Sequence, residues 1–133
     1  MDLQANIEKF FADYIRNWNA QDLDSLAAAF SEPCIFVLSS GTTVLPDNSS
    51  LKAFYAKAFD GLRASGFNHS TLDRVKAQAC ADGLAIVDVL NVTRHRKDNS
   101  VMEAIDCHFT MRQVNGVWKI VTAVWCTPGW RET

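Results

Sequence analysis

The stretch that decides the fold runs from Phe10 to Phe30 and reads FFADYIRNWNAQDLDSLAAAF. Apolar residues recur at helical spacing over residues 3–18, with polar residues between them. This pattern predicts an amphipathic helix of about four turns with one buried face. Asn19-Ala20-Gln21 interrupts the pattern, and Asp22 is placed to be the N-cap of a second, short helix.

The chain beyond this hinge is mostly of strand type. We expect a strand over Cys34–Ser39, a short returning strand over Thr42–Leu45, and a third helix with an apolar face over residues 51–62. Four long strands are then predicted, separated by turn signals, over residues 67–81, 84–93, 101–114 and 117–126. This order predicts an α+β fold, in which a strongly curved sheet wraps three helices as a cone with the first helix across its mouth.

Length and composition fit one globular domain over residues 1–133, with 48% apolar residues. The net charge of −2 argues against a nucleic-acid partner, because phosphate binding needs clustered excess Lys and Arg. No apolar run is long enough to span a membrane, and the first residues do not resemble a signal peptide. We therefore expect no membrane association and a cytoplasmic location.

Four cysteines are spread along the chain at positions 34, 80, 107 and 126. Their spacing matches no zinc motif, and all four lie in strand-like apolar segments. We expect them to be buried, reduced thiols, with no metal site and no cofactor.

Three stretches carry a family resemblance. They are residues 14–24, which end in NAQDLD, residues 105–109, which read IDCHF, and residues 115–121, which read NGVWKIV. With the order of elements, they resemble the nuclear-transport-factor-2-like superfamily, which includes ketosteroid isomerases, SnoaL-type polyketide cyclases and scytalone dehydratase. The resemblance covers roughly residues 3 to 127 and implies a cystatin-like α+β barrel with a cavity and a homodimer formed through the sheet. Such a likeness indicates the fold rather than the activity.

The ketosteroid isomerases in this superfamily imply a set of catalytic residues. Tyr14 matches the helix tyrosine that donates to the developing enolate, and Asp106 resembles a protonated aspartic acid that donates beside it. One extra residue before the His-Phe pair leaves Cys107 or His108 as alternatives for that position. Leu38 stands where the isomerases carry the aspartate that acts as base. The resemblance therefore implies Tyr14, Asp106 and His108 as a catalytic group that lacks its usual base.

Strand alternation predicts that two of these residues lie outside the cavity. It places Asp106 and His108 on one face of their strand, and Ile105, Cys107 and Phe109 on the other. A position inside the cone requires a bulge that resets the register. Otherwise the two residues lie on the outward or dimer face.

Several bulky residues are candidates for an apolar pocket at the open end of the cone, although most bulky residues are expected to form the core. Asn91 interrupts an apolar strand and is a plausible polar contact for a ligand. The expected ligand-binding residues are Trp18, Phe36, Leu38, Phe54, Phe59, Asn91 and Trp125.

Two functions remain open from the sequence. The first is binding of a small apolar, cyclic molecule, with cofactor-free proton transfer such as isomerisation, cyclisation or dehydration. The second is a non-catalytic module that binds a ligand, dimerises or serves as an accessory subunit. The catalytic function is favoured if Tyr14, Asp106 and His108 lie within hydrogen-bond distance of one another, and the binding function is favoured if Tyr14 alone faces the cavity.

Overall fold

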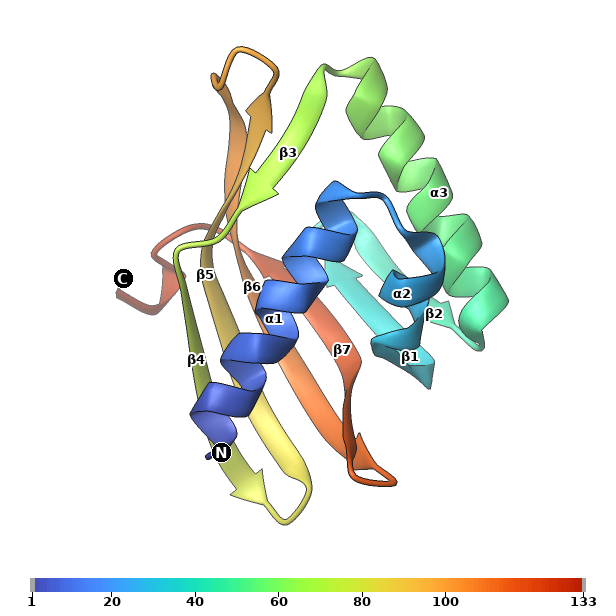
Figure 1. Cartoon of the computed structure of the whole chain (residues 1–133), viewed down its shortest axis with the longest axis vertical. Coiled ribbons are helices and arrows are strands. Elements are labelled where there is room, and N and C mark those ends of the chain that lie inside the picture. The colour runs from blue at the N-terminus through green and yellow to red at the C-terminus, as the bar shows by residue number, and fades with distance from the viewer. Residues whose placement is uncertain (1, 133) are drawn as a thin grey trace.

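The computed structural model describes residues 2–132 of the chain (Figure 1). Its elements in chain order are α1 (Leu3–Asn19), α2 (Leu23–Ala28), β1 (Phe30–Leu38), β2 (Gly41–Leu45), α3 (Asn48–Ala64), β3 (Phe67–Thr71), β4 (Arg74–Ala81), β5 (Leu84–Arg96), β6 (Val101–Val114), β7 (Val117–Cys126) and the 3₁₀ helix η1 (Trp130–Glu132).

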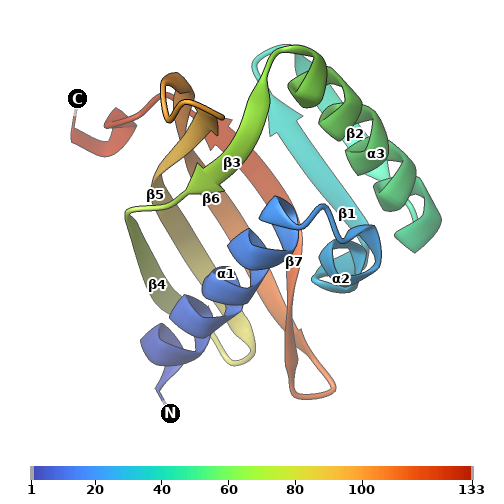
Figure 2. The same ribbon diagram turned by 45° about the horizontal axis from the view of Figure 1, so that its top comes forward.

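The strands form one curved sheet in the order β2-β1-β7-β6-β5-β3, with β4 also paired to β5. All pairings are antiparallel except that of β1 with β7, which is parallel. Helix α1 crosses the concave face of the sheet, with α2 and α3 beside it (Figures 1 and 2). The predicted α+β fold with a curved sheet around three helices is confirmed.

Each helix begins at an aspartate, as the sequence indicates for the second helix. The carboxylate of Asp2 accepts from the backbone N–H of Ala5 at 2.8 Å, and that of Asp22 accepts from Ser25 at 3.2 Å. Asp47 forms a reciprocal capping box with Ser50 at the start of α3. These caps satisfy N–H groups that a helix leaves unpaired in its first turn, so they help to fix where α1, α2 and α3 start.

The long strand predicted over residues 67–81 is divided into β3 and β4, which pair with successive parts of β5. Strand β3 pairs with β5 over Thr93–Arg96, and β4 pairs with it over Leu84–Leu90. The interruption lies opposite an irregularity in β5, where Asn91 adopts a left-handed backbone with φ of 57°. The upper end of the sheet therefore bends over the end of α1 (Figure 2).

Asp106 holds this bend from the outer face of the sheet. Its Oδ1 accepts from the backbone N–H of Asn91 at 2.8 Å, and its Oδ2 accepts from Gly129 at 3.0 Å. One carboxylate thus ties the irregular turn of β5 to the segment that follows β7. Because Asp106 is only 5% exposed, both bonds are shielded from water.

The core lies between the helices and the concave face and is rich in aromatic rings. Phe11, Phe36 and Phe59 are almost fully buried, and the ring of Phe11 lies 4.9 Å from that of Phe109. No helix within residues 2–132 is both long and apolar enough to cross a membrane.

Candidate functional site

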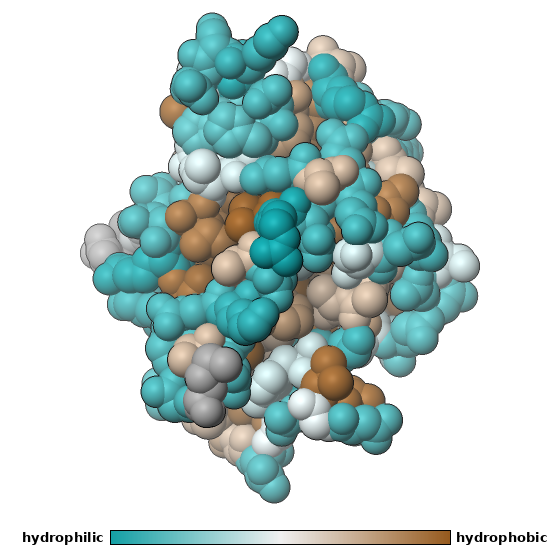
Figure 3. All heavy atoms as spheres, in the orientation of Figure 1, coloured by the Kyte–Doolittle hydropathy of each residue, from teal (hydrophilic) through white to brown (hydrophobic). Residues whose placement is uncertain are grey.

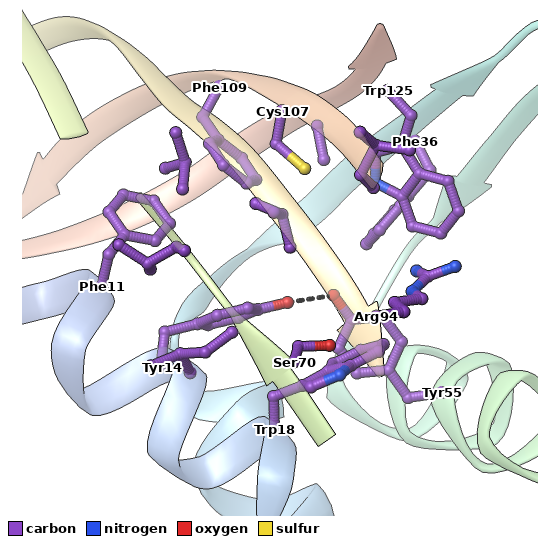
Figure 4. A pocket seen from close by; sticks show the side chains of 16 residues that line it. Phe11, Tyr14, Trp18, Phe36, Tyr55, Ser70, Arg94, Cys107, Phe109 and Trp125 are labelled. Atoms are coloured by element: carbon purple, nitrogen blue, oxygen red, sulfur yellow. Dashed lines mark hydrogen bonds between the residues drawn. The ribbon is translucent and has the colours of Figure 1, made fainter. Parts of the chain in front are cut away.

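A cavity lies between α1, α3 and the concave face of the sheet (Figure 4). Its apolar wall includes Phe11, Ile15, Val89, Val92, Ile105 and Phe109. Its volume is about 50 Å³, well below the roughly 300–1,000 Å³ of typical ligand pockets. The cavity is therefore too small for a molecule of typical ligand size unless side chains move.

The wall of the cavity reaches the surface beside α1. Ile15 on α1 and Leu72, between β3 and β4, both line the cavity and are half-buried. Figure 3 shows apolar side chains exposed in this region, near the connection from β3 to β4.

Two tyrosine hydroxyls meet at the cavity. Tyr14 on α1 and Tyr55 on α3 have their hydroxyl oxygens 2.5 Å apart, as the dashed line in Figure 4 marks. Burial in apolar surroundings raises the pKa of both hydroxyls well above their ordinary value. Both are therefore protonated at neutral pH. Because one hydrogen bond uses only one of the two protons, the pair can still donate the other.

The same cavity also has a basic residue. Arg94 on β5 is only 7% exposed, and its Nη1 donates to the carboxylate of Glu103. Its guanidinium carbon lies 5.0 Å from the ring centroid of Trp125 and 5.8 Å from that of Trp18. A guanidinium held between two aromatic faces keeps its charge at the cavity, where it is poorly solvated.

Two buried polar atoms beside Arg94 lack a partner. The indole Nε1 of Trp18 and the hydroxyl of Ser70 make no hydrogen bond to any residue within 2–132. Both residues line the cavity, and Ser70 is the direct cross-strand neighbour of Arg94. Figure 4 shows the three side chains at one end of the cavity, together with Tyr55. The site is thus apolar along its wall and hydrogen-bonding at this end.

A model of NTF2-like proteins, the family DUF6841, matches residues 4–128. The chain belongs to this family. No curated protein matches the sequence. Among solved structures, Aln2 from a Streptomyces species is similar to it, with a TM-score of 0.75 and 23% identity over 94% of this chain and 90% of Aln2.

Two further structures are similar to this NTF2-like chain. An NTF2-like protein with a cystatin-like fold from Novosphingobium aromaticivorans has a TM-score of 0.74 and 14% identity, over 91% of this chain and 79% of its own. An NTF2-like protein of unknown function from Shewanella oneidensis has a TM-score of 0.73 and 14% identity, over 92% and 97%. At these identities the likeness shows the fold alone.

Four of the residues expected at the site of this NTF2-like protein line the cavity. They are Tyr14, Trp18, Phe36 and Trp125. Trp18 and Tyr14 come from α1, Phe36 from β1 and Trp125 from β7, so three distant segments contribute. The periodicity of α1 alone places Tyr14 and Trp18 one turn apart on the same face.

The other four residues expected to bind a ligand do not line the cavity. Phe59 packs against Trp18 in the core, with ring centroids 4.5 Å apart, and Phe54 packs behind Phe36 at 4.9 Å. Leu38 ends β1, where it pairs with Gly41. Asn91 is exposed, and its contribution is the left-handed turn in β5 rather than a ligand contact.

The structure does not bring Asp106 or His108 together with Tyr14. Both side chains lie on the outer face of β6, opposite Cys107 and Phe109, which line the cavity. The Nδ1 of His108 lies 2.8 Å from Oδ1 of Asp88, and Asp106 holds two backbone N–H groups, those of Asn91 and Gly129. The bulge lies in β5 and leaves the alternation of β6 intact from 105 to 109. Asp106 and His108 therefore do not converge with Tyr14 as the family resemblance implied.

Sequence reasoning missed Tyr55, Ser70 and Arg94 as site residues. Tyr55 lies on the predicted apolar face of the third helix, where a phenol among apolar neighbours was a usable signal. Arg94 begins the segment RHRK, which resembles a solvated hairpin end. Nothing in the local pattern of Ser70 marks it, because its role depends on pairing with Arg94 across two strands.

The cysteines divide by burial. Cys34 and Cys107 are buried, and burial raises the pKa of their thiols to about 11 and about 12. Cys80 is exposed and Cys126 is half-buried, contrary to the expectation that all four are buried; Cys80 lies near the end of edge strand β4. Within residues 2–132, no cluster of three or more His, Cys, Asp or Glu side chains could hold a metal ion.

Proposed function

We propose that this NTF2-like protein binds a small, apolar, cyclic molecule in the cavity between α1, α3 and the sheet. In this proposal the Tyr14–Tyr55 pair donates a hydrogen bond to an oxygen of the ligand. The observation that carries it is a pair of neutral hydroxyls, 2.5 Å apart, in a mainly apolar wall. A protonated donor in such surroundings favours a ligand oxygen because bulk water competes poorly there.

Binding is favoured over proton transfer by the side chains of the cavity. None of the residues that line it within 2–132 is Asp, Glu or His. Burial raises the pKa of Tyr14, Tyr55 and Cys107, so these groups are protonated at neutral pH, and the guanidinium of Arg94 offers donors only. A general base must lie within about 3.2 Å of the proton it removes, directly or through one water. The cavity therefore supports holding a ligand more strongly than it supports deprotonating one.

Thermal unfolding with single-ring ligands tests the proposal. Phenol and cyclohexanone are suitable probes because each offers one oxygen and one ring. A ligand at one hundred times its dissociation constant adds about 2.7 kcal/mol, which for this length corresponds to a rise of about 10 °C in Tm. We expect the rise to shrink in Tyr14→Phe.

His108→Asn is the matched control, since His108 lies on the outer face of the sheet. We expect it to keep the full ligand-induced shift. A shift that persists in Tyr14→Phe and disappears in His108→Asn would move the site to the outer face. No shift with any single-ring ligand would count against a binding cavity altogether.

Cofactor-free proton transfer is the second candidate, and the same protein tests it. Solvent deuterium exchange at the α-carbon of cyclohexanone, followed by NMR, should not exceed the rate in buffer if the protein only binds. Exchange that requires Tyr14 would restore the catalytic hypothesis.

The homodimer through the sheet stays a prediction. Light scattering on a sizing column would test it by measuring the molar mass in solution.

A further inference from the structure

We infer that the cavity selects ring carboxylates, with the carboxylate held at the end formed by Arg94, Ser70 and Trp18. This inference rests on the proposed binding function and adds the charged group of the ligand to it. It concerns the guanidinium of Arg94 and the unpartnered groups of Trp18 and Ser70 rather than the tyrosine hydroxyls, so variants at Arg94 and at Tyr14 test the two separately.

The first observation is an arginine with donors to spare. Arg94 is buried, and its one ion-pair partner within residues 2–132 is Glu103, whose side chain is 46% exposed. Only Nη1 is used in that bond, while a guanidinium carries five N–H donors in a planar fork. The charge itself is paired with Glu103, but a buried N–H donor without a partner costs free energy, so the remaining donors favour a hydrogen-bond acceptor on the cavity side.

The second observation is the pair of unpartnered polar atoms. Trp18 and Ser70 are 5% and 3% exposed, and Nε1 of the one and Oγ of the other have no hydrogen-bond partner among the described residues. An indole N–H can only donate, and so can a guanidinium, whereas a hydroxyl can do either. A ligand that satisfies all three must therefore present acceptors.

Charge and shape narrow the acceptor to a carboxylate. Next to a fixed positive charge in a poorly solvated site, an anionic acceptor binds more strongly than a neutral one. A carboxylate has two oxygens in one plane, which matches a guanidinium and leaves lone pairs for the indole N–H and the hydroxyl. A cavity of about 50 Å³ has little room for a larger, strongly hydrated oxyanion. The apolar wall then receives the ring.

Calorimetric titration with matched ligands tests the inference. Benzoate and cyclohexanecarboxylate carry the charge, while benzamide and benzyl alcohol keep a similar size without it. At pH 7.5 we expect the carboxylates to bind at least tenfold more tightly than their neutral counterparts. Equal affinities would overturn the inference and leave the proposed binding function standing, and no binding by either class would overturn both.

Two variants locate the selectivity on Arg94. Arg94→Met keeps an unbranched stem between the tryptophans and removes the charge, so we expect the preference for benzoate to fall to about onefold. Glu103→Gln changes a partly exposed residue and removes the carboxylate that pairs with the guanidinium. We expect it to raise benzoate affinity severalfold and to leave benzyl alcohol unchanged. If Arg94 only joins β5 to β6, Glu103→Gln will not alter either affinity, and the inference fails even if Arg94→Met does not fold.

Discussion

Removing the hydroxyls of Tyr14 and Tyr55, singly and together, tests the geometry of the cavity most directly. Each single change to Phe deletes one partner of a 2.5 Å bond and leaves the other hydroxyl in apolar surroundings. Leaving a buried polar group unsatisfied costs about 1–3 kcal/mol. We expect each single variant to lose about 1.5 kcal/mol of the free energy of unfolding.

The double variant should lose less than the two single variants combined. With both hydroxyls gone, neither position is left with an unsatisfied hydroxyl, and Phe fills nearly the same volume. We therefore expect a loss of about 1 kcal/mol instead of about 3, a coupling of about 2 kcal/mol. The entropy of unfolding is about 0.28 kcal/mol/K for 133 residues, so each single variant should lower Tm by about 5 °C.

Urea unfolding followed by far-UV circular dichroism measures all four proteins. Val44→Ala, at a residue 60% exposed on β2, supplies the control cycle with Tyr14→Phe and should be additive. Additivity of Tyr14→Phe and Tyr55→Phe within about 0.5 kcal/mol would refute the reasoning, because it would mean that the hydroxyls do not share a hydrogen bond.

Three further outcomes are expected. Burial raises the pKa of Tyr14, Tyr55 and Cys107 in the folded state, so these groups ionise at lower pH in the unfolded chain. The free energy of unfolding should therefore stay constant up to about pH 9 and fall above it, less steeply in Cys107→Ala. A free energy of unfolding, measured in urea, that does not change from pH 7 to 11 would contradict this. The exposed thiol of Cys80 should react quickly with a disulfide reagent at pH 8, and Cys80→Ser should remove this fast phase. Cys107 is buried and should react only when the protein unfolds. Fast labelling of Cys107, located by mass spectrometry, would be inconsistent with its burial. Asp106→Ala should lower the free energy of unfolding, measured in urea, by about 1–3 kcal/mol because two backbone N–H groups lose their acceptor. Asp106→Asn should lower it by less. If Asp106→Ala is as stable as the parent protein, these bonds do not hold the bend.

The fold was predictable because local signals agree along most of the chain. The 3.6-residue periodicity before Asn19, the aspartate cap at position 22 and the Asn-Gly turn at 115–116 each indicate one element, and the structure has all of them. Long antiparallel hairpins then leave few ways to arrange the sheet around the helices. Local sequence patterns alone were sufficient to predict the order of elements and the fold class.

The site was less predictable because it depends on register and on contacts between distant segments. The left-handed turn at Asn91 shifts the pairing of β5 with β6, and its partner Asp106 lies fifteen positions further along the chain. Alternation correctly put Asp106 and His108 on the outer face, while the family resemblance pointed inward. The physical pattern of this chain was the better guide than the catalytic residues of similar proteins.

The hydrogen-bonding end of the cavity should lower the stability of the free protein, and Ser70 is the residue at which this can be measured. Its buried hydroxyl has no partner within residues 2–132, so the folded state bears the cost of removing it from water. Ser70→Ala deletes that atom and little else.

We expect Ser70→Ala to raise the free energy of unfolding of the ligand-free protein by about 1 kcal/mol and to weaken benzoate binding severalfold. A group that destabilises the fold yet strengthens binding is typical of a functional site, whereas a purely structural serine would show the opposite sign in unfolding. Urea unfolding and calorimetry on the same preparation give both values. A loss of stability with unchanged benzoate affinity would assign Ser70 to the packing of β3 against α1 and remove it from the ligand site.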